Sequence, residues 1–219
     1  MRRVFPWLFL IVGTVGLFLT WPGHNAEYSW RATSLDDAGS ETCQSNLRAI
    51  GLAFAHYAQD FDGKFPRGVD TEDRAPETWS GGYGGRFAQD SKTVPLLPEV
   101  LSPYLEKREI WKCPSDIGWT KRRSNFPSQL GVVKPSSFVR FGTSYYYYTI
   151  HGFAGLRPQD IRDPSSDAVL FDGDLWHRSN WSDTLNALFA DGHVENLPGK
   201  RFEDLGDRQN FVLPPSARM

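Results

Sequence analysis

The segment from Cys43 to Pro66 constrains the fold most, because it has the pattern of an amphipathic helix with a defined end: CQSNLRAIGLAFAHYAQDFDGKFP. Its apolar residues recur at intervals of three, four and seven, which places them on one helical face. These residues are Leu47, Ile50, Phe54, Tyr57, Ala58 and Phe61. Ser40 is positioned to cap the first turn, and Asp62-Gly63 tolerates the positive φ at which a helix stops. We therefore predict a helix of about twenty residues with one buried face.

An uncharged apolar run lies close to the N-terminus, from Val4 to Trp21. At about 1.5 Å per residue, a helix of this length spans roughly 27 Å, which is close to the hydrocarbon thickness of a bilayer. Arg2 and Arg3 precede the run, and positive residues favour the cytoplasmic side. We therefore expect a single-pass protein of the inner (cytoplasmic) membrane, with its soluble part extracytoplasmic.

The chain divides on this basis into three parts. Residues 1–21 are the membrane anchor or signal-anchor, and residues 22–39, which mix Pro, Gly, Asn and charged residues, are a linker. Residues 40–219 then form one extracytoplasmic domain, since 219 residues with 40% hydrophobic composition support one compact core plus an anchor. The net charge of −2, with both signs mixed along the chain, gives no electrostatic footprint for nucleic acid.

Two other interpretations of the N-terminus stay open. A cleaved secretory signal needs small residues before the cut, and the nearest candidate, just before Glu27, has His24 at one of these positions. The Arg-Arg-x-Phe sequence that ends at Phe5 partly matches a twin-arginine signal, but it lacks the flanking polar residue and Lys. A retained anchor therefore fits the sequence better than cleavage.

Short strands are predicted in the second half of the chain. Ser144 to Ile150 is rich in Tyr and Thr, and Ala168 to Phe171 and Asn186 to Ala190 are short apolar runs. Asp191-Gly192 is a tight-turn signal that predicts a hairpin of the last two strands, and Ile110 to Cys113 has the pattern of a short extended piece. A helix followed by a loop-rich middle and several strands predicts an α+β domain, with the helix packed on a small antiparallel sheet.

Four segments resemble one known family. C-x-S-N-L-R-x-I-G-L-A followed by Y-A-Q-D-F-D-G-K-F-P, within residues 43–66, is similar to prepilin-like proteins related to the G-type pseudopilins of type II secretion. Three later segments look like the same family, in the family's order: Leu101–Asp116, Gly142–Tyr148 and Leu188–Glu195. The resemblance covers residues 40 to 197.

This resemblance implies a pilin-like fold, in which a membrane helix continues into an amphipathic helix covered by a small antiparallel sheet. It also implies a structural or assembly role at the bacterial envelope, linked to type II secretion, with the membrane and other pseudopilin or secretion-system proteins as partners. The chain departs from the family at the prepilin cleavage site, where Arg3-Val4-Phe5-Pro6 stands and no Glu follows within the apolar run. This departure from the family counts against prepilin processing and pilus-type polymerisation.

The chain has two cysteines, Cys43 and Cys113. Both lie in family-like segments, and an extracytoplasmic domain is in a compartment where a disulfide forms. We therefore predict a Cys43–Cys113 disulfide. Two buried free thiols are the alternative.

Potential metal ligands are concentrated near the C-terminus. They are Asp172, Asp174, His177, Asp183, Asp191 and His193. The close Cys or His pairs typical of zinc sites are missing, whereas calcium prefers several oxygen ligands on a loop. Major pseudopilins carry a calcium site in their C-terminal loop, so the resemblance implies calcium here, although the His177 to Asp191-Gly192 spacing is longer than in the family's signature. Alternatively, these Asp-Gly pairs only form turns and the histidines are surface groups.

Aromatic residues in predicted loops suggest a second function. They are Trp79, Tyr83, Trp119, Trp176 and Trp181. Exposed aromatics stack on sugar rings or on partner proteins, so the alternative function is an extracytoplasmic binding module for polysaccharide or a protein. Packing of these aromatic side chains onto the core is the competing interpretation.

No catalytic motif is recognised, so no enzyme is predicted. A metal-dependent hydrolase around His177, Asp191 and His193 is the weakest alternative.

Overall fold

The computed structural model describes residues 23–71, 73–74, 92–119, 132–179 and 182–206. These residues form an α+β fold with a small antiparallel sheet, as the sequence predicts. Within this part of the chain, no helix is both long enough and apolar enough to cross a membrane. The predicted span from Val4 to Trp21 lies outside the described residues.

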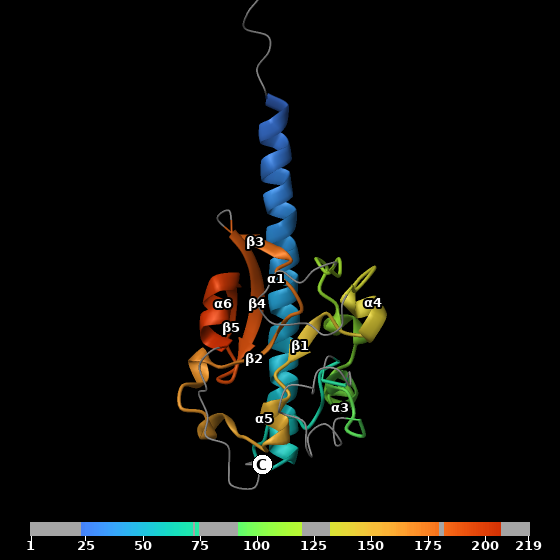
Figure 1. Cartoon of the computed structure of the whole chain (residues 1–219), viewed down its shortest axis with the longest axis vertical. Coiled ribbons are helices and arrows are strands. Elements are labelled where there is room, and N and C mark those ends of the chain that lie inside the picture. Colours follow the sequence, from blue (N-terminus) through green and yellow to red (C-terminus); the bar gives the residue numbers. More distant parts are fainter. Residues whose placement is uncertain (1–22, 72, 75–91, 120–131, 180–181, 207–219) are drawn as a thin grey trace, which may run out of the picture.

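The long helix α1, Gly23–Asp60, runs along the long axis of the molecule (Figure 1). The prediction of a linker over residues 22–39 is wrong for residues 23–39, which are helical. The physical reason is that no proline interrupts the sequence between Gly23 and Asp60, so the helix can continue through the polar stretch. Ser40 therefore lies inside α1 and is not its cap; its hydroxyl donates to Asn186 Oδ1 at 3.1 Å.

The end of α1 is where the sequence predicts it. Asp62 and Gly63 adopt positive φ angles of 56° and 78°, and the Gly63 N–H donates to the Ala58 carbonyl at 2.8 Å. Phe61 follows the last helical turn and is 48% exposed, although it was predicted to belong to the buried face. It stacks on Tyr57 with ring centroids 4.1 Å apart, because the chain turns away before Phe61 can reach the core.

The sheet has five antiparallel strands: β1 Tyr145–Tyr147, β2 Ala168–Asp172, β3 His177–Ser179, β4 Ser182–Phe189 and β5 Val194–Pro198. The long strand β4 is its centre and pairs with β2, β3 and β5, while β1 pairs with β2. The predicted hairpin is present, since β4 and β5 are joined at Gly192, which has a φ of 90°.

The sheet is covered on both faces. On one face, Leu170 and Leu188 pack with the buried side of α1, including Leu47 and Ile50. On the other face, Phe171, Leu185 and Phe189 belong to a second core with Phe202 of the helix α6, Gly199–Gly206. This alternation is what a strand with two buried faces requires.

Seven short helical turns lie in the remaining described chain. They are α3 Leu97–Val100, η2 Ser102–Tyr104, η3 Arg108–Trp111, α4 Ser137–Phe141, α5 Ile150–Phe153, η4 Pro158–Asp160 and η5 Pro164–Ser166. The predicted extended piece Ile110 to Cys113 is wrong for Ile110 and Trp111, which belong to η3. The indole of Trp111 is buried in the core next to α1, so tertiary packing outweighs the β-propensity of this segment.

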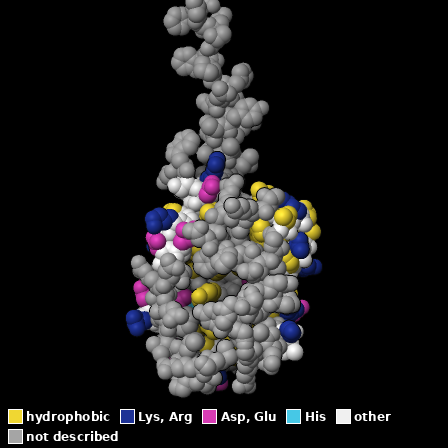
Figure 2. All heavy atoms as spheres, in the orientation of Figure 1, with side chains coloured by type: hydrophobic (Ala, Val, Ile, Leu, Met, Phe, Trp, Pro, Cys, Tyr) yellow, Lys and Arg dark blue, Asp and Glu magenta, His cyan; other side chains and the backbone are white. Residues whose placement is uncertain are grey.

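Hydrophobic side chains also gather on the surface near α4 (Figure 2). Ile117 is 67% exposed and Val139 is 66% exposed, and Val132 is also exposed. The chain between Trp119 and Val132 lies outside the described residues.

Candidate functional site

The predicted Cys43–Cys113 disulfide is present. Cys43 comes from α1, and Cys113 lies just after η3; their Cα atoms are 5.1 Å apart and both residues are 0% exposed. The Cys113 backbone N–H donates to the Ser144 hydroxyl at 3.0 Å, just before β1. The disulfide therefore fixes α1 covalently to the segment that leads into the sheet.

A buried Asp-His pair lies against this disulfide. Asp172 ends β2 and His177 begins β3, so the short connection between the two strands brings both side chains to the α1 face of the sheet. His177 Nε2 lies 3.2 Å from Asp172 Oδ2 and 3.5 Å from Cys113 Sγ. Asp172 Oδ2 also accepts from the Asn186 backbone N–H at 2.7 Å and from its side-chain amide at 2.9 Å.

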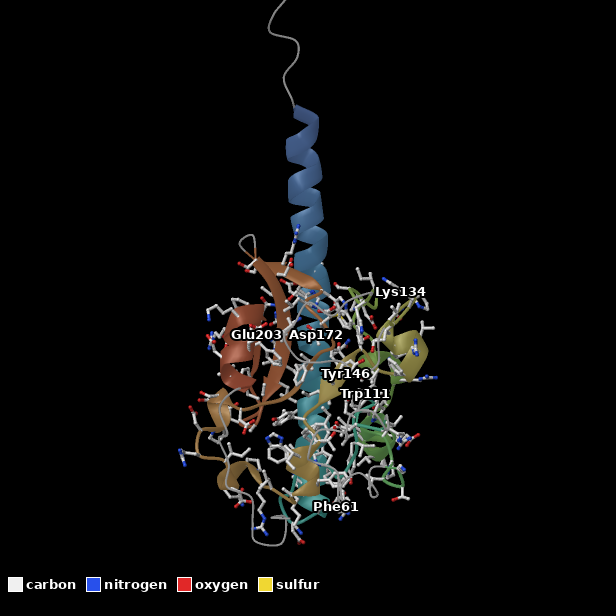
Figure 3. All side chains as sticks on the ribbon, in the orientation of Figure 1. Phe61, Trp111, Lys134, Tyr146, Asp172 and Glu203 are labelled. Carbon is white, nitrogen blue, oxygen red and sulfur yellow. A yellow bond between two sulfur atoms is a disulfide. The ribbon has the colours of Figure 1, made fainter. Side chains whose placement is uncertain are left out.

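Together these residues form a compact group of ligand-type atoms. One such atom from each of Cys43, Cys113, Asp172 and His177 lies within 4.8 Å of all the others. Figure 3 shows Asp172 next to α1. Tyr145 packs nearby, and burial, with the negative charge of Asp172 as a smaller cause, raises the pKa of its hydroxyl well above the ordinary value of 10.0. The group is thus in a dry, low-dielectric part of the protein.

The other predicted metal ligands do not belong to this compact group. Asp174 is buried, and its Oδ1 accepts from the Leu175 N–H at 2.8 Å. Asp183 pairs with Arg178 at 3.2 Å near the surface. Asp191 and His193 pair with each other at 2.6 Å at the exposed β4–β5 turn.

The six predicted ligands are therefore not one site in the described structure. Only Asp172 and His177 belong to the compact group, and the other members of that group are the two cysteines. The Asp191-Gly192 turn agrees with the simpler interpretation, in which this dipeptide forms a hairpin. Calcium binding at any of these positions stays a prediction.

Of the predicted aromatic residues, the structure describes Trp119 and Trp176. Trp119 is 3% exposed and packs in the second core, where its ring lies 5.8 Å from Tyr146 and 6.4 Å from Trp176. Trp176 is half-buried and its Nε1 donates to the Gly118 carbonyl at 3.3 Å. The competing interpretation, packing onto the core, is correct for Trp119. Trp79, Tyr83 and Trp181 lie outside the described residues.

The sequence does not reveal the buried carboxylate of Asp116, which is not among the predicted ligands. Its Oδ1 accepts from the backbone N–H groups of Gly118 and Ser137, both at 2.9 Å. Its Oδ2 accepts from the Phe138 N–H at 2.8 Å and from the Ser144 hydroxyl at 2.7 Å. Four donors satisfy this carboxylate, so it organises the chain around α4 and has little capacity left for a ligand.

A second buried Asp-His pair, Asp167 and His151, connects two segments of the fold. His151 Nε2 lies 3.1 Å from Asp167 Oδ1, and its Nδ1 lies 2.9 Å from the Tyr148 carbonyl. Phe65 packs edge-on against the imidazole ring at 5.2 Å. This pair ties α5 to the residue that precedes β2.

Comparisons of the chain with models of protein families, with curated proteins and with solved structures found no significant match.

Proposed function

We propose that this protein is a membrane-anchored, pseudopilin-like envelope protein with a structural role in assembly, linked to type II secretion. In this proposal residues 1–21 are the anchor, and α1 carries the domain away from the membrane. Partner proteins then contact the domain through its exposed surfaces.

The observation that carries the proposal is the length and placement of α1. The helix has 38 residues, which at 1.5 Å per residue corresponds to about 57 Å. Its C-terminal part packs on the sheet, while its N-terminal part projects beyond the domain (Figure 1). In the sequence the apolar run that ends at Trp21 directly precedes the start of α1. A projecting helix that follows an apolar run is what a domain held at a membrane needs.

The C-terminal part of α1 is held firmly enough to act as a rod. Leu47 and Ile50 are 0% exposed, and the Cys43–Cys113 disulfide adds a covalent link to the domain. Side-chain hydrogen bonds add a polar contact, because Ser40 donates to Asn186 Oδ1, which also accepts from the Asn196 amide at 2.9 Å. A force or a contact on the helix is thus transmitted directly to the sheet.

The opposite face of α1 is open to a partner. Its residues are exposed at helical intervals and include Ser45, Arg48, Leu52 and Ala55. Leu52 is 66% exposed, an unusual position for a large apolar side chain in a helix that already has a buried face. We propose that this face contacts a second helix in the assembly.

Site-specific photo-crosslinking tests the proposal. A photoreactive amino acid is placed at Leu52 on α1 and, as a matched control, at Val139 on α4, since both residues are apolar and 66% exposed. The proposal predicts crosslinks from Leu52, in the membrane fraction, to another copy or to another membrane-anchored helical protein. Crosslinks from Val139 but not from Leu52 would contradict a role for the α1 face.

A further inference from the structure

The disulfide is surrounded by the other ligands that a zinc ion needs. We propose that, when the disulfide is reduced, Cys43, Cys113, Asp172 and His177 bind one Zn²⁺ in a tetrahedral site. The site is independent of the proposed function in assembly, because it depends only on the core of the domain and on the oxidation state of two cysteines.

The distances already present match two edges of a zinc tetrahedron. With Zn–S near 2.3 Å and Zn–N and Zn–O near 2.0–2.1 Å, tetrahedral geometry sets the S···N edge at about 3.6 Å and the N···O edge at about 3.3 Å. In the structure, Cys113 Sγ lies 3.5 Å from His177 Nε2, and His177 Nε2 lies 3.2 Å from Asp172 Oδ2. The imidazole and carboxylate therefore need little movement.

The two sulfur atoms have to separate for zinc to enter. A tetrahedral site requires an S···S distance of about 3.8 Å, from the same Zn–S length. With Cα atoms 5.1 Å apart, rotation of the two cysteine side chains about χ1 moves the sulfurs apart while the backbone of α1 stays in place. Reduction is the necessary first step, since the thiolate is the zinc ligand.

Charge balance favours the replacement of the buried disulfide by two thiolates and a zinc ion. The two sulfur atoms of the disulfide carry no charge in the oxidised group. In the proposed site Zn²⁺ adds two positive charges and the thiolates of Cys43 and Cys113 add two negative charges, so the net buried charge does not change. Without a metal, ionising either buried thiol would place an uncompensated charge in a low-dielectric region. The ion is therefore what makes the thiolate form accessible.

The residues around the group are arranged to orient its ligands. Asn186 donates twice to Asp172 Oδ2, which fixes the plane of the carboxylate. Asp172 Oδ1 has no hydrogen-bond partner within the described part of the chain, although it is buried. The carboxylate thus keeps its link to Asn186 through Oδ2, while the lone pairs of Oδ1 are available for an ion close to the His177 ring. Partners of this kind hold metal ligands in productive orientations.

The two chemical steps balance. A dithiol reductant gives two electrons and two protons to the Cys43–Cys113 bond, which yields two thiols and the cyclic disulfide of the reductant. Zinc then replaces the two thiol protons, which leave to the solvent, and the His177 ring proton is held on Nδ1 so that Nε2 can bind the ion. The metal thus links Cys43 and Cys113 in the dithiol form of the chain, whether before oxidation or after reduction. It holds the domain together at the same point as the disulfide does in the oxidised form.

Metal titration of the full chain in detergent micelles tests the proposal. The protein is reduced anaerobically with dithiothreitol in the presence of chelator, and both are removed. Zinc is then added in competition with a chromophoric chelator, and Co²⁺ is used in parallel as a spectroscopic probe. We expect one Zn²⁺ per reduced chain, intense d–d and thiolate-to-cobalt bands typical of tetrahedral coordination, and no binding at this site in the oxidised chain.

Variants distinguish this site from other zinc binding. His177→Ala should weaken zinc binding at least about 100-fold, since even loss of an outer-shell partner costs about 10- to 100-fold. Cys43→Ala/Cys113→Ala should abolish the cobalt charge-transfer bands. His193→Ala is the matched control and should leave the affinity unchanged, because His193 is exposed at the β4–β5 turn and pairs with Asp191.

Folding gives a second measurement if the reduced, metal-free chain loses its structure. In that case zinc should restore the near-ultraviolet circular dichroism of the reduced wild type but not of the His177→Ala variant. A reduced wild type that neither binds zinc stoichiometrically nor recovers its structure with zinc would overturn the proposal. Equal binding by wild type and His177→Ala would also overturn it, because the site then does not use this histidine.

Discussion

Removal of the disulfide should destabilise the domain strongly, because it connects distant parts of the chain. Cys43 and Cys113 are separated by 70 positions. In the chain-entropy description, closing a loop of this size lowers the entropy of the unfolded chain by about 15 cal/mol/K, which corresponds to about 4 kcal/mol at 25 °C. The Cys43→Ala/Cys113→Ala variant should therefore lose about 4 kcal/mol of unfolding free energy. For a protein of this size, the melting temperature should fall by about 8–16 °C.

The contacts at the two ends of the disulfide support an effect of this size. Both cysteines are completely buried, and no other covalent bond joins α1 to the sheet in the described residues. Alanine is used in place of serine because a buried hydroxyl without a partner would add its own desolvation cost. The loss then reports the cross-link and a small change in packing.

Urea denaturation followed by tryptophan fluorescence measures the loss. The variant is compared with the oxidised wild type and with the wild type reduced in the presence of chelator, so that bound metal cannot replace the disulfide. The reduced wild type keeps both sulfur atoms, and its difference from the variant isolates their contribution to packing. The m-value should be higher for the variant and for the reduced wild type than for the oxidised wild type, since an unfolded chain without the cross-link exposes more surface. If the variant and the reduced wild type each lose less than about 1 kcal/mol of unfolding free energy, the reasoning from loop entropy is refuted.

Three further outcomes are expected. Burial raises the pKa of Tyr145 and Tyr147 well above 10.0, so the contribution of these two tyrosines to stability should not change with pH below pH 10. As the pH rises further, the unfolded tyrosines ionise and the folded ones do not, so the free energy of unfolding should fall. Tyr147→Phe should reduce the slope of this fall by about 1.4 kcal/mol per pH unit, measured by urea denaturation. Asp172→Ala should lower the free energy of unfolding by about 3 kcal/mol or more, because it leaves buried hydrogen-bond donors unpaired. Asp191→Ala, at the exposed turn, should lower it by less than about 1 kcal/mol. Thermal melts of the two variants compare these losses. Leu188→Ala should lower the free energy of unfolding by about 3–5 kcal/mol, measured by urea denaturation. The Leu188 side chain lies between the sheet and α1 and is 1% exposed.

Local patterns predict the parts of this fold that local forces determine. The buried positions of Leu47, Ile50 and Phe54 follow from helical spacing, and the end of α1 follows from the two residues that tolerate positive φ. The β4–β5 hairpin follows from the turn-forming preference of Asp191-Gly192. In each case the residues that set the conformation are neighbours in the sequence.

The start of α1 and the shape of the WKCP segment depend on forces that the local pattern does not contain. Residues 23–39 lack a clear apolar face and contain polar residues, which suggested a linker, yet nothing in them stops a helix that continues into a well-packed one. Ile110 and Trp111 have high β-propensity, but burial of the indole against α1 selects a helical turn. Composition alone does not distinguish these outcomes.

The candidate site was predictable in part. The pairing of Cys43 with Cys113 follows from there being two cysteines and from the expectation that the domain is extracytoplasmic, and Asp172 and His177 were both candidate ligands. Their meeting at the disulfide depends on the register of β2 and β3 against β4 and on where α1 crosses the sheet. The signal that could have suggested it is that two predicted ligands flank a tight connection between strands.

The central claim, an assembly function that depends on the anchor, is tested most directly by replacing residues 1–21 with a cleavable signal sequence. The full-length chain and the released domain, both with the photoreactive amino acid at Leu52, are compared in intact cells. We predict that the full-length chain crosslinks to its partner in the membrane fraction and that the released domain, although folded, loses these crosslinks. Equal crosslinking by the released domain would contradict the claim and favour a binding module that acts without an anchor.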